Sequence, residues 1–433
     1  MSAAETTAES TGDVPDNIPP TAYVLAIVLG FIGAIGGSIF LWLMHVLQNG
    51  YYVDIPQALG WSEPPPWYVM GGLLVSVGII VLARRLPGKT GKGPLTGFHF
   101  DNPPRVAASI LIAALATLTF GASLGPEGPL IVVGTTIGGL LMRKAPANIV
   151  TMAMFLTGIA AIGTIFGNPF ITIFLLLEFV AMGAAPKVIL LPAFVALGAG
   201  YITQIGWGSW TGLGVMTLSV PDLPAYESIA PGDLAMGLVV ALVAALLTAV
   251  ARELGERVQA MGDRKPTATL LGAGIVTGIV AIIVVQVFDV NYDQILFSGQ
   301  SGMSSLIAET SIAAVIAITI GKLIVYGVAL GGGFRGGPIF PATFIGVAFG
   351  VFAALLFPSV DVSPMAAVGI AAASTVMTRL PFTSAMIAML LIGAAGVAIA
   401  PFAIIGAVGG VVALQVLDRV DARSAVTAKA MSA

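Results

Sequence analysis

The chain of 433 residues has no cysteine and only two histidines, His45 and His99. Without cysteine it cannot form disulfides, use a thiolate nucleophile or bind a metal through sulfur. The two histidines lie far apart in the sequence, so we expect no metal site and no cofactor. An enzyme embedded in a membrane needs a cluster of nucleophile, base or metal ligands, and its absence argues against an enzyme.

Charged residues are also scarce. Lys, Arg, Asp and Glu together make up 9% of the chain, hydrophobic residues make up 57%, and the mean hydropathy is +1.01. This composition predicts an all-α integral membrane protein of many helices in contact with lipid, rather than a soluble domain. The net charge of −3 gives no indication of a nucleic-acid partner.

The composition divides the chain into three parts. Residues 1–20 are polar and acidic and lack the basic start of a signal peptide, so we expect a disordered N-terminal tail. Residues 21–417 are the expected transmembrane domain. Residues 418–433 carry several charges and are expected to form a short C-terminal tail.

Two apolar segments, at about 21–47 and 67–86, are each long enough to span a membrane. A basic loop follows the second segment, and the positive-inside rule places such a loop in the cytoplasm. We therefore expect a multi-pass protein of the plasma (inner) membrane with both termini cytoplasmic. The cations of this loop are Arg84, Arg85, Lys89 and Lys92.

Beyond Pro104 the apolar segments become short, and glycine and proline separate them in place of long polar loops. Short segments with Gly and Pro breaks indicate tilted, broken and re-entrant helices. In the first half we expect segments at about 105–120, 129–142, 148–166, 169–182 and 188–205. In the second half we expect them at about 234–251, 268–288, 303–318, 320–330, 339–357, 365–378, 382–398 and 401–417.

The second half of the chain repeats landmarks of the first half in the same order, at offsets between 209 and 212 residues. This indicates an internal duplication, with repeat one at about 67–206 and repeat two at about 233–417. Duplicated transporters bind substrate near the midplane, where the repeats meet. The matched landmarks are Gly128-Pro129 with Gly337-Pro338, Gly158–Ala161 with Gly369–Ala372, and Pro169-Phe170 with Pro381-Phe382.

The stretch Gly121–Pro129 (GASLGPEGP) contains a carboxylate, Glu127, at the start of an apolar segment. A charge at membrane depth costs several kcal/mol, so its presence indicates a function. The surrounding Gly and Pro interrupt the helix, and such irregular backbone is tolerated in a membrane where it lines a cavity. The N-terminus of the following helix attracts anions. We infer an anion site that the glutamate of the chain can itself occupy.

A cation transporter is the alternative class. It would need several carboxylates within the membrane, and only Glu127, Glu178 and Glu309 are candidates. Free helix N-termini favour anions instead. Ion flux with chloride or sodium as the only permeant ion distinguishes the two classes.

Three motifs resemble those of the CLC chloride channels and proton/chloride antiporters. Gly125–Pro129 (GPEGP) resembles the G-[KR]-E-G-P motif of that family, and Gly337–Pro341 (GPIFP) resembles its G-x-F-x-P motif. Gly91–Pro94 (GKGP) is a shortened likeness of its G-S-G-I-P motif. The resemblance covers nearly all of residues 22–417, in the right order.

The resemblance implies a CLC-like fold of two inverted repeats and a homodimer in which each subunit has its own anion pathway. It also implies that Glu127 is a gating glutamate, whose carboxylate blocks the pathway until it is protonated or displaced by an anion. The anion-binding positions that it implies are Lys92, Gly93, Gly125, Gly128, Gly337, Ile339 and Phe340.

The chain departs from the family pattern at the anion site. Pro126 replaces the basic residue before the glutamate, and Arg335 is a candidate for the missing positive charge. Lys92 stands where the family has its central serine. Pro338 lacks an N–H group, so the amides of Ile339 and Phe340 are expected to bind the anion instead.

It also departs at the proton path and at the inner pore. Antiporters of the family carry a proton-relay glutamate as the second of two adjacent Glu, whereas this chain has Glu178 followed by Phe179. The pore tyrosine near the last helix has no counterpart, because residues 398–433 contain no Tyr. Glu178 is the one candidate left for an inner proton site.

Four of these residues also have a structural interpretation. Glu127 could cap a helix, Glu178 could lie at the cytoplasmic interface, Lys92 could be a solvated loop cation, and Arg335 a snorkelling cation. We predict transport of chloride or similar monovalent anions through a glutamate-gated, channel-like or loosely coupled pathway. The alternative is a proton-coupled chloride or fluoride antiporter, with protons as a second substrate.

Overall fold

The structure is a computed structural model that describes residues 19–214, 217–221 and 223–431. The expected disordered tail at residues 1–20 lies almost wholly outside the described residues. Within these ranges the regular elements of the chain are helices. The β-type pairing within them is an isolated bridge between Gly125 and Gly337. The fold is therefore the expected all-α membrane fold.

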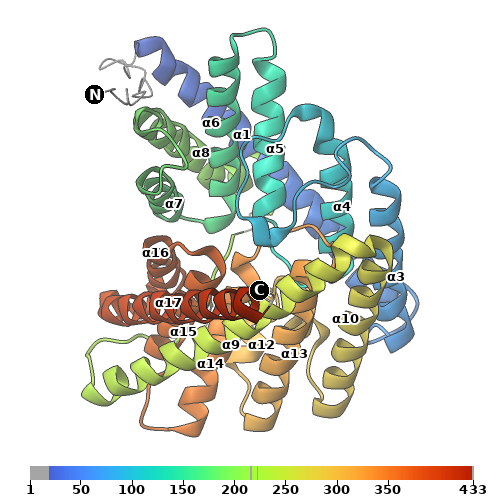
Figure 1. Ribbon diagram of the computed structural model, residues 1–433, viewed down its shortest axis with the longest axis vertical. Coiled ribbons are helices and arrows are strands. Elements are labelled where there is room, and N and C mark those ends of the chain that lie inside the picture. Colours follow the sequence, from blue (N-terminus) through green and yellow to red (C-terminus); the bar gives the residue numbers. More distant parts are fainter. Residues whose placement is uncertain (1–18, 215–216, 222, 432–433) are drawn as a thin grey trace.

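Figure 1 shows the arrangement of the helices and labels most of the α-helices. The α-helices are α1 (Pro20–Asn49), α2 (Ile55–Ala58), α3 (Pro66–Ala83), α4 (Ala107–Thr119), α5 (Glu127–Leu141), α6 (Ala147–Phe166), α7 (Pro169–Ala181), α8 (Leu190–Thr211), α9 (Pro231–Arg264), α10 (Pro266–Phe288), α11 (Tyr292–Ile295), α12 (Met303–Ile307), α13 (Ile312–Gly331), α14 (Ile339–Leu356), α15 (Val362–Thr378), α16 (Pro381–Leu391) and α17 (Ala400–Met431). The short turns are η1 (Gly50–Asp54), η2 (Pro94–Thr96), η3 (Pro104–Val106), η4 (Lys187–Ile189), η5 (Gly393–Ala395) and η6 (Val397–Ile399).

Helix lengths show which elements can cross a bilayer. In the described part of the chain, nine helices are long and apolar enough to span a membrane. Five apolar segments are shorter, among them α5, whose 15 residues extend about 22 Å at 1.5 Å per residue. A hydrocarbon core is about 30 Å thick, so these short helices stop within it or cross it as parts of a broken span. The expected broken and re-entrant helices are present.

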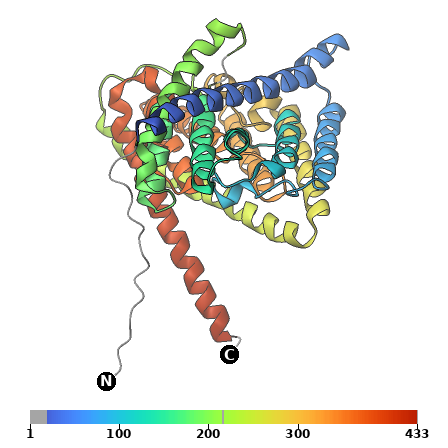
Figure 2. The same ribbon diagram turned by 90° about the horizontal axis from the view of Figure 1, so that it is seen from above.

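Most of the expected segments are confirmed, but the division expected near residue 319 is wrong. Segments were expected at 303–318 and 320–330, whereas α12 ends at Ile307 and α13 runs unbroken from Ile312 to Gly331. The break lies at residues 308–311, where the Ser311 side chain accepts a hydrogen bond from the Ala314 N–H group and caps α13. At the C-terminus, α17 continues to Met431, so most of the expected tail is helical and projects from the body (Figure 2).

The two halves of the chain form two packed layers (Figure 1). In the first half α1 packs against α6 and α8, and α5 packs against α6. In the second half α9 packs against α15 and α17, and α14 packs against α15. By these contacts α1 corresponds to α9, so the first repeat would include α1. The expected boundary instead places the start of the first repeat near residue 67. The repeat boundaries stay a prediction.

Glycines bring the central helix pairs into close contact in both halves. A Cβ on Gly134 or Gly138 of α5 would collide with the backbone of α6, and a Cβ on Gly346 or Gly350 of α14 would collide with the backbone of α15. Small residues allow such close approach between membrane helices. The N-termini of α5 and α14 are thereby fixed deep in the molecule, where the two halves meet.

Candidate anion site

The site is built where the breaks before α5 and α14 meet. Gly125 and Gly337 form an antiparallel bridge in which the Gly125 N–H group donates to the Gly337 carbonyl at 2.8 Å and the Gly337 N–H group donates back at 2.6 Å. The bridge satisfies backbone groups that lipid cannot satisfy. Both glycines were expected to bind the anion through backbone N–H groups, but in this conformation each N–H group donates to the carbonyl of the other glycine.

The bridge also corrects the register of the internal repeat. Gly128-Pro129 was expected to match Gly337-Pro338, at an offset of 209 residues. In the structure Gly125-Pro126 is the counterpart, because each Gly-Pro pair directly precedes its helix and the two glycines pair with each other. In this register Glu127 corresponds to Ile339, so the carboxylate is unique to the first repeat.

Glu127 is fully buried at the N-terminus of α5. Its Oε1 atom accepts a hydrogen bond of 2.9 Å from the Phe340 N–H group of α14, and the N–H group of Ile339 lies close to the same carboxylate. Its Oε2 atom has no hydrogen-bond partner among the described residues. The carboxyl group thus lies between two helix N-termini, where backbone N–H groups and helix dipoles favour a negative charge.

The two bridging glycines leave room for this carboxylate. A Cβ atom placed on either Gly125 or Gly337 would overlap Glu127 Oε2. The sequence needs glycine at both positions because the carboxylate passes directly over their Cα atoms. Sequence reasoning named both glycines but assigned them to the anion rather than to the glutamate.

Sequence reasoning missed a tyrosine at the site. Tyr326 of α13 is fully buried, and its hydroxyl donates a hydrogen bond of 2.6 Å to the Pro338 carbonyl, directly before α14. Its hydroxyl therefore fixes the helix end that faces Glu127. The family pattern places a pore tyrosine near the last helix, so no motif pointed to Tyr326 in α13.

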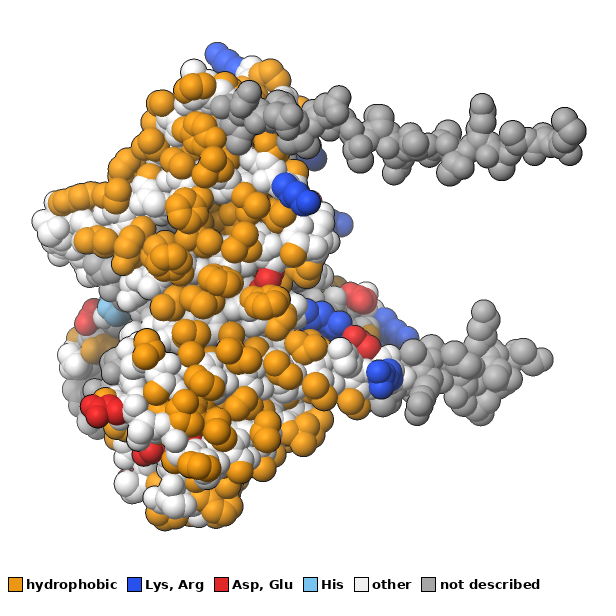
Figure 3. All heavy atoms as spheres, turned by 90° about the vertical axis from the view of Figure 1, so that its left-hand side faces the viewer, with side chains coloured by type: hydrophobic (Ala, Val, Ile, Leu, Met, Phe, Trp, Pro, Cys, Tyr) orange, Lys and Arg blue, Asp and Glu red, His pale blue; other side chains and the backbone are white. Residues whose placement is uncertain are grey.

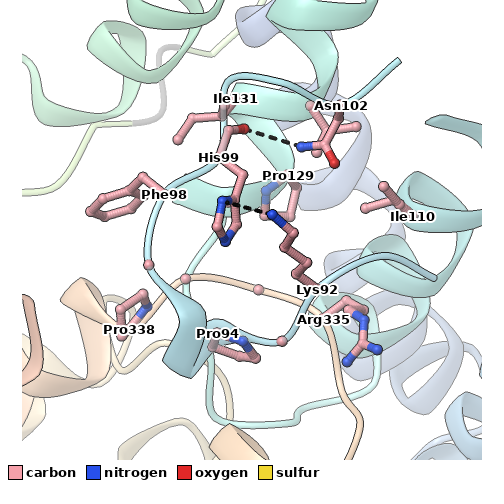
Figure 4. A pocket seen from close by; sticks show the side chains of 16 residues that line it. Lys92, Pro94, Phe98, His99, Asn102, Ile110, Pro129, Ile131, Arg335 and Pro338 are labelled. Carbon is pink, nitrogen blue, oxygen red and sulfur yellow. Dashed lines mark hydrogen bonds between the residues drawn. The ribbon is translucent and has the colours of Figure 1, made fainter. Parts of the chain in front are cut away.

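A small cavity of about 60 Å³ lies between the basic loop that follows α3 and the helix breaks before α5 and α14 (Figure 4). It brings together five of the predicted positions, which share the cavity lining with Phe98, His99 and Asn102. Glu127, Gly125, Ile339 and Phe340 lie behind this lining, at the helix ends. The predicted residues that line the cavity are Lys92, Gly93, Gly128, Arg335 and Gly337.

Lys92 points into this cavity toward His99 (Figure 4). Its Nζ atom lies 3.4 Å from His99 Nδ1 and 4.0 Å from the exposed carboxylate of Asp101. Lys92 therefore lines the cavity, and more than half of its side chain is exposed to solvent. Burial and the neighbouring Lys92 ammonium lower the pKa of His99, and the Asp101 carboxylate partly opposes this shift.

Arg335 holds the loop that carries Lys92. Its Nε atom donates to the Thr90 carbonyl at 2.6 Å and its Nη2 atom to the Gly91 carbonyl at 3.1 Å. Thr90 has a φ of 73°, a left-handed conformation that a β-branched residue rarely adopts. Arg335 is therefore not a snorkelling surface cation, because its guanidinium ties the strained loop of the first half to the helix break of the second half.

Glu178 lies elsewhere, at the contact between α7 and α16. Its carboxylate accepts hydrogen bonds from the Phe382 N–H group at 2.9 Å, from the Thr383 N–H group at 2.7 Å and from the Thr383 hydroxyl. Glu178 is buried, and its carboxylate caps the first turn of α16. Its neighbour Phe179 packs against Phe98 and Phe100, with ring centroids 6.2 and 6.1 Å apart.

A membrane-embedded helical bundle in which two broken helices meet at a buried carboxylate has the architecture of an ion-transport protein. The chain belongs to the voltage gated chloride channel family, because the sequence model of that family matches residues 87–415. The expected membership of the CLC family is thereby confirmed, and CLC proteins are transporters or channels rather than enzymes.

Individual relatives agree with this assignment. The chain is 26% identical over 367 residues to YfeO of Escherichia coli (strain SMS-3-5 / SECEC), which is named as a candidate ion-transport protein; the match covers 82% of this chain and 84% of that protein. The fold is similar to that of a slow cyanobacterial Cl⁻/H⁺ antiporter, with a TM-score of 0.76, 18% identity and coverage of 93% and 96%. It is also similar to a CLC-type fluoride/proton antiporter, with a TM-score of 0.69, 19% identity and coverage of 90% and 94%.

Proposed function

We propose that the chain transports chloride or similar monovalent anions through a pathway gated by Glu127, and that transport is uncoupled from protons or only loosely coupled. The pathway runs from the cavity at Lys92 to the helix ends of α5 and α14. In the closed state the Glu127 carboxylate occupies the position that an anion takes in the open state.

One observation carries this proposal. The Glu127 carboxylate is fully buried and is held by a backbone N–H group of the opposite repeat rather than by a cationic side chain. Backbone N–H groups at a helix N-terminus favour negative charge, whether it belongs to a carboxylate or to a mobile anion. A carboxylate that is held only in this way can be exchanged for a mobile anion, or released when it is protonated.

The inner end of the pathway supports weak proton coupling. A proton relay needs a titratable group that is free to gain and lose its proton. The carboxylate of Glu178 already accepts three hydrogen bonds at the start of α16, and Phe179 offers no titratable group. Neither residue is therefore suited to supply protons to Glu127.

The test is anion flux from liposomes loaded with chloride. In Glu127→Gln the side chain cannot ionise, and it mimics the protonated gate. We expect the variant to keep a high chloride flux and to lose most of the pH dependence of the parent protein. Glu309→Gln is the matched control, because Glu309 is an exposed carboxylate at another helix start. If Glu127→Gln kept the pH dependence of the parent, Glu127 would not be the gate.

Coupled antiport is the alternative, and it is favoured by the activities named for two structural neighbours, a Cl⁻/H⁺ antiporter and a fluoride/proton antiporter. The same liposomes distinguish the two mechanisms. Under an imposed pH gradient, uncoupled flux reverses at the chloride equilibrium potential. A reversal potential displaced by a fixed proton-to-anion ratio would establish coupling.

The proposal includes a homodimer and insertion into the plasma membrane with both termini in the cytoplasm. The side of the molecule built from α7, α8, α16 and α17 is densely apolar (Figure 3), and residues such as Phe194, Ile205 and Phe382 are more than half exposed on these helices. Such a surface requires either lipid or a second copy of the chain. A cross-linking experiment with the protein in liposomes decides between them.

A further inference from the structure

The cavity contains one group that the proposed mechanism does not use, the imidazole of His99. His99 is half-buried, and it lines both the small cavity and a second, apolar cavity of about 980 Å³ between α6, α7 and the start of α8. Its side chain faces the Lys92 ammonium across the small cavity (Figure 4). Histidine changes charge nearer to neutral pH than any other ordinary side chain.

Hydrogen bonds fix the tautomer of the neutral ring. The Thr96 hydroxyl donates its single proton to the Gly93 carbonyl, at 2.7 Å. The same oxygen lies 3.0 Å from His99 Nε2, so it must accept a hydrogen bond from Nε2–H. The proton of the neutral ring is therefore on Nε2, and Nδ1 is free to accept from the Lys92 ammonium 3.4 Å away.

Protonation of His99 changes both groups at once. When Nδ1 gains a proton it no longer accepts a hydrogen bond from Lys92, and two positive charges face each other at 3.4 Å. An anion between them would accept hydrogen bonds from both and remove the repulsion. Asp101, 4.0 Å from Lys92, is exposed to water and competes only weakly for the ammonium.

No other charge in the described lining takes over this role. Arg335 is the remaining charged residue of the small cavity, and its guanidinium nitrogens are committed to backbone carbonyls. The helix starts of α5 and α14 contribute only Gly128, Pro338 and apolar side chains to the cavity. The charges that face His99 are thus Lys92, Arg335 and Asp101.

From this geometry we propose that His99 and Lys92 form a proton-dependent anion subsite at the inner mouth of the pathway, in which uptake of one proton on Nδ1 accompanies binding of one monovalent anion. The inference rests on the proposed function and deepens it. The subsite makes anion binding from the cytoplasm stronger at acidic pH, independently of Glu127. The proton returns to the same aqueous side when the anion leaves, so the subsite senses pH without exchanging protons across the membrane.

The test is calorimetric titration of the purified full-length protein with chloride, in a Glu127→Gln background that removes the titration of the gate. The pKa of His99 lies below its ordinary value, so the window must extend further into the acid range. Between about pH 7.5 and about pH 4.5 we expect the chloride affinity to rise about fivefold, as one added unit charge at about 4 Å in water would produce. In His99→Gln the affinity should stay constant across this range. His45→Gln is the matched control, because His45 is the other histidine of the chain and hydrogen bonds to Asn49 in α1.

Proton uptake gives an independent measurement. Titrations in buffers of different ionisation enthalpy report the protons taken up with each chloride. Near pH 6 we expect a clear fraction of a proton in the His45→Gln control and none in His99→Gln. Chloride binding with the same pH dependence in both variants would overturn the subsite and leave the proposed function intact. Absence of chloride binding in every variant would overturn both.

Discussion

Replacement of Glu178 should destabilise the protein rather than alter proton movement. Its carboxylate accepts two backbone N–H groups, at 2.9 and 2.7 Å, and one hydroxyl at the start of α16. A lost helix cap costs about 0.5–2 kcal/mol, and a lost hydrogen bond to a charged group costs about 1.5–3 kcal/mol. These terms overlap, so we expect Glu178→Ala to lower the free energy of unfolding by about 2–4 kcal/mol.

The conservative variant refines this expectation. Glu178→Gln keeps one acceptor oxygen for the backbone N–H groups, so its cost should be about half that of Glu178→Ala. The assay is thermal unfolding in detergent together with chloride flux in liposomes. Both variants should melt at lower temperature, and the molecules that remain folded should transport chloride at the rate of the parent protein.

The control is Glu309→Ala. Glu309 also accepts two backbone N–H groups, from Thr310 and Ser311 at 2.9 and 2.8 Å, but it is exposed to solvent. Water replaces those bonds, so the cost should stay below about 1 kcal/mol. Unchanged melting in Glu178→Ala, or proton movement that depends on Glu178 at unchanged stability, would refute the capping role and restore Glu178 as a proton carrier.

Two other predictions concern the site. In Gly337→Ala the added methyl group fills the position that the Glu127 carboxylate occupies in the closed state and that an anion takes in the open state, so chloride flux in liposomes should fall; Gly78→Ala in α3, where a Cβ meets open space, should leave the flux unchanged, and a Gly337→Ala protein with the flux of the parent would contradict this prediction. In Arg335→Lys the ammonium cannot make both hydrogen bonds of the guanidinium, so backbone hydrogen exchange of residues 88–99, measured by mass spectrometry, should become faster. Unchanged exchange would show that the loop keeps its conformation without Arg335.

The sequence was sufficient to predict the membrane class, the family and most helix positions. Apolar length, Gly-Pro breaks and the basic loop are local signals, and the structure confirms the helices that they predict. The break at residues 308–311 was missed although the sequence carries a signal for it. Glu309, Thr310 and Ser311 are three consecutive polar residues before an apolar run, and Ser311 is a residue type that caps helices, as its hydrogen bond from the Ala314 N–H group shows.

Contacts between distant segments could not be predicted. Glu178 was considered as an interfacial or proton-path residue, yet its partners are backbone N–H groups of α16 that lie 204 and 205 residues further on. Gly125 and Gly337 were both expected at the site, but their mutual bridge and the corrected register follow only from their positions in space. The partnership of Lys92 with His99 was also invisible, because two loop residues seven positions apart give no periodic signal.

The bridge between Gly125 and Gly337 has a consequence for biogenesis. A ribosome releases the first half of the chain into the membrane well before the second, and the Glu127 carboxylate then lacks the amide of Phe340, which lies 213 residues further along. During that interval the backbone groups of Gly125 and the Glu127 carboxylate need hydrogen bonds from water, from the insertion machinery or from a transient partner. Ribosome stalling or truncation between the halves would therefore leave an intermediate that quality-control proteases can recognise. Co-expression of the two halves as separate polypeptides should protect both from degradation, since each half supplies the backbone hydrogen-bonding groups that the other half lacks.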